Sequence, residues 1–398
     1  MSYSLSLKGL LLKDQNWYHY HQYYSQEENG GIRDSVVNSI TQVLSCKQTV
    51  RGYSHYHCSN PDCTHEKRSA FTCKNRVCNS CGRIATENWM EKQKAILPFC
   101  EWQHVTLTMP SELWPFFNVD RKLLNTICAL AANVLLTIAK KKGILPGIFL
   151  AIHTFGRDLK WNVHFHLSVT RGGLCDDKKT WKSLFFKASI IMRMWRYRVI
   201  KFFRTLYNNA ELTLPADVSG KSFNQFLDKQ YKKSWHIHCA KPSSDPIKDL
   251  TYLSRYIKRP PFANSRLKHY DGNDVIFQYL NHTTKRHNLF KCDVFHFITR
   301  LIQHIHEKGF RMIRYYGFLA NRVRGKLLPI VNELFPRDNA EPTKVTWQAL
   351  LKQAFGLDPL ECVLCKSPMR LSYVKFGLSN SELRSHHDKL AQKKYVRH

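Results

Sequence analysis

The spacing of the cysteines constrains the fold of this chain more than any other feature of the sequence. Four residues separate Cys58 from Cys63, and two separate Cys78 from Cys81. Each short turn can present two thiolates, so two such pairs can close around one tetrahedral zinc ion. We therefore predict a cysteine-rich loop module over residues 55–82 that needs zinc to fold, with Cys58, Cys63, Cys78 and Cys81 as the preferred ligands. Cys73 and His65 lie between the pairs and are alternative ligands.

The other cysteines add less to this prediction. The chain has 13 cysteines, and its first residues lack the basic start and apolar core of a secretion signal, so we expect a cytoplasmic protein with free thiols and metal sites. Cys362 and Cys365 form half of a further site. The only nearby residues that could complete it are His386 and His387, so a second zinc ion is left open.

The charge of the chain points to a polyanionic partner. Lys and Arg number 61 against 30 Asp and Glu, a formal net charge of +31. A folded surface with this excess attracts DNA, RNA or an anionic membrane. The longest nearly apolar run, Thr126 to Ala139, is shorter than the roughly 20 residues of a membrane span, so we interpret it as a buried helix. We expect no membrane partner.

The basic residues concentrate in acid-free stretches. Residues 178–204 contain no acid and interleave basic with aromatic side chains, and residues 308–326 form a second stretch of this kind. One interpretation is a solvated helix face over an aromatic core; the other, which we favour for two such stretches, is a nucleic-acid groove. The candidate DNA contacts in the first stretch are Lys187, Arg193, Arg196 and Lys201.

A histidine-rich hairpin is predicted over residues 147–169. From Asn162 to Val169 polar and apolar residues alternate, as in a strand with one buried face, so His164 and His166 point to the same side. If residue 152 pairs with 163 and 150 with 165, His153 lies opposite Asn162 on that same side. Three imidazoles on one face can bind a metal and leave positions open for substrate. A plain surface strand rich in histidine is the alternative.

A short helix with two tyrosines is predicted over residues 246–258. Pro246 suits its first turn, and Pro260 with Pro261 ends it. Tyr252 and Tyr256 fall on the side opposite the apolar stripe. Their basic neighbours on that side are Lys248, Arg255 and Arg259. Such surroundings attract a phosphate and favour the phenolate, although tyrosines that only stack on nucleic acid would show the same pattern.

Coarse patterning predicts an α+β protein, with few strands and many helices. Helices are expected at 33–45, 84–97, 120–141, 180–207, 293–308 and 318–334, and a strand at 103–109. We predict an N-terminal helical segment (1–45), a zinc-binding, DNA-binding module (46–100), a catalytic domain (101–292) and a helical, basic C-terminal region (293–398).

Histidine-bound metal and tyrosine together suggest one chemistry. A tyrosine that attacks a metal-polarised phosphodiester leaves a 5′-phosphotyrosine and a free 3′-hydroxyl, and it conserves the bond energy in the covalent link. No nucleotide triphosphate is then required, and the sequence contains no P-loop pattern.

At these residues the chain resembles the rolling-circle transposases of bacterial insertion sequences. These are two-tyrosine enzymes with a histidine–hydrophobic–histidine (HUH) pair and an N-terminal zinc-binding domain. The resemblance runs from Cys58 to Met369 and rests on five segments: residues 72–81, 104–110, 153–168, 252–260 and 314–318. Asn79 departs from the proline that many relatives have inside the second cysteine pair.

The resemblance implies an HUH nuclease core, an antiparallel sheet flanked by helices, that cuts one DNA strand at the ends of a transposable element. His164 and His166 match the HUH pair, and Tyr252 and Tyr256 match the paired nucleophiles. The spacing of His153 from the pair is similar to that of the three metal histidines in conjugative relaxases.

The resemblance also implies Mg²⁺ or Mn²⁺ at the histidines, single-stranded element ends and target DNA as partners, and a location on the bacterial nucleoid. Ligand chemistry alone favours manganese or zinc at three imidazoles. The alternatives are a plasmid replication initiator, a relaxase, or a zinc-dependent DNA-binding regulator without nuclease activity.

Overall fold

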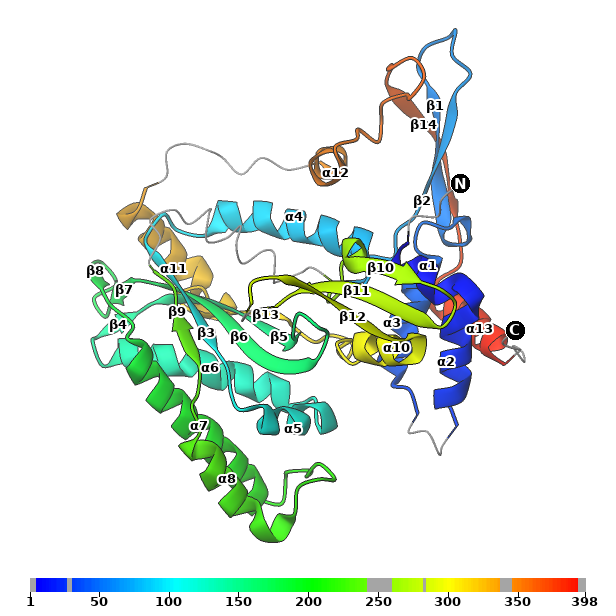
Figure 1. Cartoon of the computed structure of the whole chain (residues 1–398). Helices are drawn as coiled ribbons and strands as arrows, with labels where there is room; N and C mark the ends of the chain where they lie inside the picture. Colours follow the sequence, from blue (N-terminus) through cyan, green and yellow to red (C-terminus); the bar gives the residue numbers. More distant parts are fainter. Residues whose placement is uncertain (1–4, 27–30, 242–259, 282–283, 337–345, 393–398) are drawn as a thin grey trace.

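An antiparallel five-stranded sheet lies at the centre of the molecule, with helices on both of its faces (Figure 1). The computed structural model describes residues 5–26, 31–241, 260–281, 284–336 and 346–392. The strand order is β13-β5-β6-β3-β9. These strands span β3 (Trp102–Leu107), β5 (Gly147–Phe155), β6 (Trp161–Thr170), β9 (Ile237–Cys239) and β13 (Ile313–Gly317). The α+β fold class predicted from the sequence is confirmed.

One face of this sheet forms the main hydrophobic core. Alternate residues such as Leu150, Ile152, Phe165 and Leu167 are fully buried, as the period-two pattern predicts. The helices that contribute to this core are α5 (Trp114–Val119), α6 (Leu123–Lys140), α7 (Ala188–Asn208) and α8 (Phe223–Lys232). By length and composition α6 could cross a membrane, but its residues from Leu124 to Ala139 contribute many of the side chains of this core. It is the buried helix that the sequence predicts.

The hairpin of β5 and β6 pairs in a register different from the predicted one. Ile152 lies opposite Phe165 and His153 opposite His164, a shift of two residues. The register shifts between His153 and Phe155, and the last pair before the turn is Phe155 with Trp161. Residues 156–160 therefore form the turn. A shift of two keeps every side chain on its face, so the predicted common face of the three histidines survives the correction.

The opposite face of the sheet is partly covered by α4 (Asn79–Ile96) and α11 (Asn321–Leu334). Trp89 of α4 packs against Phe149 of β5, with ring centroids 6.2 Å apart. Its indole Nε1 donates to the hydroxyl of Tyr315 in β13 at 3.2 Å, and that hydroxyl donates to Gln93 of α4 at 3.0 Å. Figure 1 shows α4 along one side of the sheet and α6 along the other.

A second core lies beside the central sheet. It combines N-terminal helices with a later meander and helix: α1 (Leu7–Leu12), α2 (Asn16–Tyr24), α3 (Asp34–Ser45), β10 (Leu267–Tyr270), β11 (Asp274–Leu280), β12 (His287–Asp293) and α10 (Val294–Ile302). The predicted helices at 33–45 and 293–308 correspond to α3 and α10. Two small sheets complete the fold: β4 (Ile144–Leu145), β7 (Gly172–Cys175) and β8 (Trp181–Ser183); and β1 (Gly52–Cys58), β2 (Glu66–Ala70) and β14 (Met369–Phe376).

The C-terminal residues return to parts of the fold formed much earlier in the chain. β13 is an edge strand of the central sheet, β14 pairs with β1, and α13 (Asn380–Ala391) packs on α2 and α3. α12 (Trp347–Phe355) packs against α4, which also comes from much earlier in the chain. The expected helical C-terminal region is therefore neither wholly helical nor separate from the preceding regions.

Candidate metal centres and nucleic-acid interface

The cysteines predicted to form one zinc site are divided between two clusters. Cys78 and Cys81 group with Cys73 and Cys46, whereas Cys58 and Cys63 group with Cys362 and Cys365. In each cluster the sulfur atoms lie within 4.8 Å of one another. The predicted grouping of Cys58 and Cys63 with Cys78 and Cys81 is thus wrong, and the alternative ligand Cys73 belongs to the first cluster.

The local structure explains this division. Cys78 is the N-cap of α4 and Cys81 lies in its first turn, so both face the end of α3, where Cys46 follows Ser45. Cys58 is the last residue of β1. A strand of seven residues spans roughly 20 Å, so Cys58 lies about that far from the start of β1. The sequence gives no direct signal for Cys46, which has no cysteine neighbour within a short turn.

The first cluster has the shape of a closed four-thiolate site. The sulfur of Cys46 lies 3.7 Å from that of Cys81 and 3.6 Å from that of Cys78, and Cys73 lies 3.6 Å from Cys81. A tetrahedral ion with sulfur ligands at about 2.3 Å needs sulfurs about 3.8 Å apart. All four cysteines are buried, which fits a structural rather than a catalytic role.

The three predicted histidines meet on the face of the sheet opposite the main core. His153 comes from β5, and His164 and His166 come from β6. One ring nitrogen from each lies within 4.8 Å of the others, and the ring centroids are 4.8 to 5.3 Å apart. His153 and His166 are buried and His164 is half-buried, so the group opens to solvent on one side.

Hydrogen bonds orient two of these rings. His164 Nδ1 donates to the carbonyl of Asn162 at 3.0 Å, which leaves Nε2 with its lone pair for a ligand. His166 Nδ1 lies 3.1 Å from Nε2 of His104, and the hydroxyl of Thr106 lies 3.2 Å from that same His104 nitrogen. His104 and Thr106 of β3 therefore contact the Nδ1 side of His166. Hydrogen bonds to the second ring nitrogen usually fix the orientation of metal-binding imidazoles.

Burial disfavours the charged form of His166 and of its neighbour His104. It lowers the pKa of His166 well below the usual value, and the nearby His153, His164 and His104 lower it further. Burial also lowers the pKa of His104 to about 4. A neutral imidazole is the form that binds a metal ion, so the lowered pKa of His166 and the three converging rings fit a divalent cation.

The predicted tyrosine helix lies outside the described residues. This applies to Tyr252 and Tyr256 and to the neighbouring candidates Lys248, Arg255 and Arg259. The described chain ends at Lys241 after β9 and resumes at Pro260. β9 pairs with β3, so the first of these flanks extends from the sheet that carries the histidines.

Helix α7 carries the remaining predicted DNA contacts. Lys187 is its N-cap residue, Arg193 and Lys201 are exposed, and Arg196 is half-buried with its guanidinium 4.4 Å from the ring centroid of Tyr231. Some aromatic side chains of residues 178–204 are buried in the core and others are exposed to solvent. Trp195 and Phe203 are fully buried, whereas Tyr197 is 55% exposed. The core-packing interpretation therefore holds for one face of α7, and the other face is basic.

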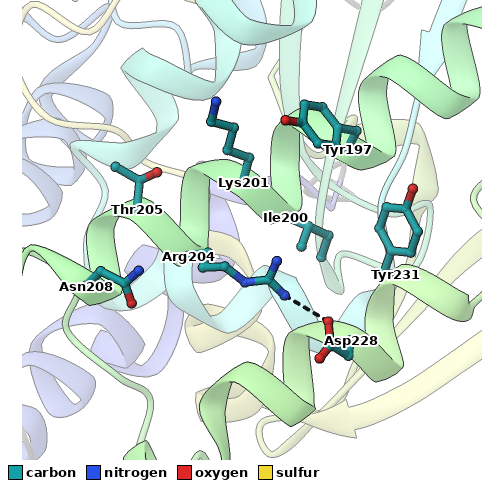
Figure 2. Close-up of a pocket in the computed structure, with 8 residues that line it drawn as sticks. All are labelled: Tyr197, Ile200, Lys201, Arg204, Thr205, Asn208, Asp228 and Tyr231. Carbon is teal, nitrogen blue, oxygen red and sulfur yellow. Dashed lines mark hydrogen bonds and ion pairs between the residues drawn. The ribbon is translucent and has the colours of Figure 1, made fainter.

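A hollow of about 510 Å³ lies between α7 and α8 on this basic face. Figure 2 shows Tyr197, Lys201 and Arg204 along α7 and Tyr231 with Asp228 on α8. Arg204 is paired with Asp228 at 2.8 Å, and Lys201 and Tyr197 are among the other residues that line the hollow. Cations beside an accessible aromatic ring are the elements of a single-strand binding surface.

The comparisons with known proteins agree with these features. A family model described as "Putative transposase" matches residues 147–326, and one described as "Transposase zinc-binding domain" matches residues 16–109. The "Transposase for insertion sequence element IS801" of Pseudomonas savastanoi pv. phaseolicola is 38% identical over 98% of this chain and 95% of its own length. This chain belongs to the insertion-sequence transposases. The resemblance to the rolling-circle class with an N-terminal zinc-binding domain is confirmed.

A second transposase relative is more distant. The "Putative transposase y4qJ" of Sinorhizobium fredii is 26% identical over 77% of this chain and 79% of its own length. No solved structure matches the chain.

Two of the side-chain clusters of this transposase lie inside the residue ranges that match the family models. The cluster of Cys46, Cys73, Cys78 and Cys81 lies entirely inside the zinc-binding domain, which supports structural zinc in this part of the chain. His153, His164 and His166 lie inside the region that matches the transposase model. As a transposase, the protein cleaves DNA and transfers strands, and DNA is its partner.

Proposed function

We propose that this transposase cuts and rejoins single DNA strands by tyrosine transesterification and thereby drives rolling-circle transposition. The observation that carries the proposal is the convergence of His153, His164 and His166 on one face of the central sheet, inside the region that matches the transposase model. Three imidazoles with an open side can hold a metal ion beside a substrate phosphate.

The metal we propose is Mg²⁺ or Mn²⁺, and the chemistry of the ligands favours Mn²⁺. When bound, the ion would act as a Lewis acid that polarises the scissile phosphate. His153, His164 and His166 would hold it, and His104 with Thr106 would keep the ring of His166 in place.

The nucleophiles we propose are Tyr252 and Tyr256. The phenolic oxygen of one tyrosine attacks the phosphorus and the bond from phosphorus to the 3′-oxygen breaks. The phenol loses one proton, and the leaving 3′-oxygen takes one up. The products are a 5′-phosphotyrosine and a free 3′-hydroxyl. With two tyrosines, one can hold a cleaved end while the other attacks a second strand.

The DNA-binding surface we propose combines the zinc-binding module with the basic face of α7. Lys187, Arg193, Arg196 and Lys201 would neutralise phosphates of the single-stranded element ends or the target, and Tyr197 would stack on bases. Lys248, Arg255 and Arg259 would bind phosphates next to the tyrosines. We infer that the protein acts in the bacterial cytoplasm, on the nucleoid.

Covalent capture of DNA tests the proposal. The full chain is incubated with Mn²⁺ and an element-end oligonucleotide labelled at its 3′ end, and the denatured protein is analysed for attached label. We expect an adduct with the wild type and none with the Tyr252→Phe/Tyr256→Phe or His164→Ala/His166→Ala variants. Tyr279→Phe, at a half-buried tyrosine of β11, is the matched control and retains the adduct. An unchanged yield in the double tyrosine variant would contradict the proposal.

A further inference from the structure

The second cysteine cluster joins parts of the chain that are about three hundred residues apart. Cys58 and Cys63 come from the hairpin of β1 and β2, and Cys362 and Cys365 precede β14. The sulfur of Cys58 lies 3.3 Å from that of Cys365, and the sulfur of Cys63 lies 3.9 Å from that of Cys362. These separations suit a single tetrahedral ion, for which about 3.8 Å is expected.

The backbone around both pairs forms the tight turns that such a site needs. The amide of Cys63 donates to the carbonyl of Asn60 at 3.1 Å. On the other side, the amide of Lys366 donates to the carbonyl of Cys362 at 3.0 Å, and Lys366 has the positive φ of 62° that closes the turn. Each turn therefore presents two thiols from one side, as in paired zinc knuckles.

His65 contributes a further polar contact to this cluster. Its Nδ1 lies 3.1 Å from the sulfur of Cys362. Polar partners of this kind hold metal-ligating side chains in place. The sequence offers His65 as an alternative ligand. Its position beside Cys362 fits instead a side chain that hydrogen-bonds to a ligand sulfur.

The hydrophobic cluster around these cysteines is small. The buried hydrophobic residues here are Cys58, Cys362 and Met369, with only Tyr56, Cys63 and Cys365 packed against them. Most of β14 is exposed, including Phe376 at 84%. Small units of this kind usually need a metal or disulfides to fold, and all the cysteines of the chain are free.

We propose that Cys58, Cys63, Cys362 and Cys365 bind a second zinc ion, which fastens the C-terminal segment to the N-terminal module. The zinc-binding unit is then composite, because residues 360–376 complete a structure that begins at Gly52. Cys58 pairs in register with Met369, and Gly52 with Phe376. This corrects the sequence-based choice of partners for Cys362 and Cys365: His387 instead accepts a hydrogen bond from Trp17 of α2 at 2.7 Å. The proposal does not depend on the nuclease mechanism.

Metal analysis of the purified full chain tests the stoichiometry. Counted after subtraction of any zinc that the His164→Ala/His166→Ala variant loses, we expect two zinc ions per chain in the wild type and one in the Cys362→Ser/Cys365→Ser variant. The Cys73→Ser/Cys78→Ser variant should lose the other ion. Cys292→Ser, at a half-buried cysteine of β12 outside both clusters, is the matched control and should keep two. One zinc in the wild type, iron in place of the second zinc, or two in the Cys362→Ser/Cys365→Ser variant would overturn the proposal.

Two measurements locate the ion without relying on a variant that folds. In the native wild type, alkylation followed by mass spectrometry should find Cys362 and Cys365 protected until a chelator is added. Hydrogen exchange should then rise at least tenfold across residues 369–376 and stay unchanged in β5 and β6. Alkylation of Cys362 and Cys365 at full rate before chelation would contradict the site.

Discussion

His104 shows how much a single residue outside the predicted ligand set can matter. It lies on β3, and its Nε2 is 3.1 Å from Nδ1 of His166, with the two rings stacked. Because this contact fixes the ring of His166, we expect His104→Ala to weaken Mn²⁺ binding to the full chain about tenfold without unfolding it. Titration calorimetry of the zinc-loaded protein measures this. His287→Ala, at an exposed histidine of β12, is the control, and wild-type affinity in His104→Ala would exclude the positioning role.

His304 couples stability to pH. Its Nε2 donates to the carbonyl of Leu159 at 3.0 Å and Nδ1 lies 3.2 Å from the hydroxyl of Thr154, so the neutral ring is fully bonded. The pKa of His304 is lowered to about 3, mainly because the ring is buried. The hydrogen bond to Leu159 raises this pKa, whereas three positive charges lower it further, those of Arg121, Arg76 and Arg300. As the pH falls, His304 takes up a proton in the unfolded state near pH 6.5 but in the folded state only near pH 3. The free energy of unfolding therefore decreases as the pH falls below about 6.5.

From pH 7 to pH 5 this one group should remove about 2 kcal/mol from the free energy of unfolding. Urea unfolding at both pH values measures the loss. His304→Gln cannot take up the proton, so its loss over the same interval should be smaller by that amount. An equal loss in the two proteins would show that His304 is not responsible.

At the scale of elements, α4 connects the cysteine cluster to the histidine face of the sheet. Its N-terminus carries Cys78 and Cys81, and Trp89 farther along is 6% exposed and packs on Phe149. We expect Trp89→Ala to lower the free energy of unfolding by about 3 kcal/mol, because it leaves a large cavity and removes the bond to Tyr315. Lys92→Ala on the exposed side of α4 is the control. Chemical denaturation with matched zinc content measures the difference, and equal effects of the two variants would contradict the packing role.

At the scale of the whole molecule, the net charge of +31 governs DNA affinity. If about eight phosphates of a single strand are neutralised, the logarithm of the binding constant should fall against the logarithm of salt concentration with a slope of about −6. Lys201→Ala on α7 should make that slope less negative by about 0.7, whereas Lys268→Ala, exposed on β10, should leave it unchanged. Fluorescence anisotropy across a salt series measures both, and a slope near zero would exclude an electrostatic mode of binding.

Local pattern in the sequence was enough to predict the histidine face. Alternation along Asn162 to Val169 places His164 and His166 on one side whatever the neighbouring strand does, and His153 shares that side in any register shifted by two. The buried helix α6 and the cysteine turns are local features of the same kind. The tyrosine helix stays a prediction, because it lies outside the described residues.

Only the tertiary structure decided which cysteine pairs share a metal. A C-x2-C or C-x4-C turn specifies two thiols and a direction, but not the segment that supplies the other two. The cost of closing a loop rises slowly with its length, so joining Cys362 to Cys58 costs only about 2 kcal/mol more than joining Cys78 to Cys58. The pairing of β1 with β14 and the turn into α4 settle that choice. The sequence by itself determined which residues can bind metal and which face they occupy, and the long-range packing of strands and helices decided their partners.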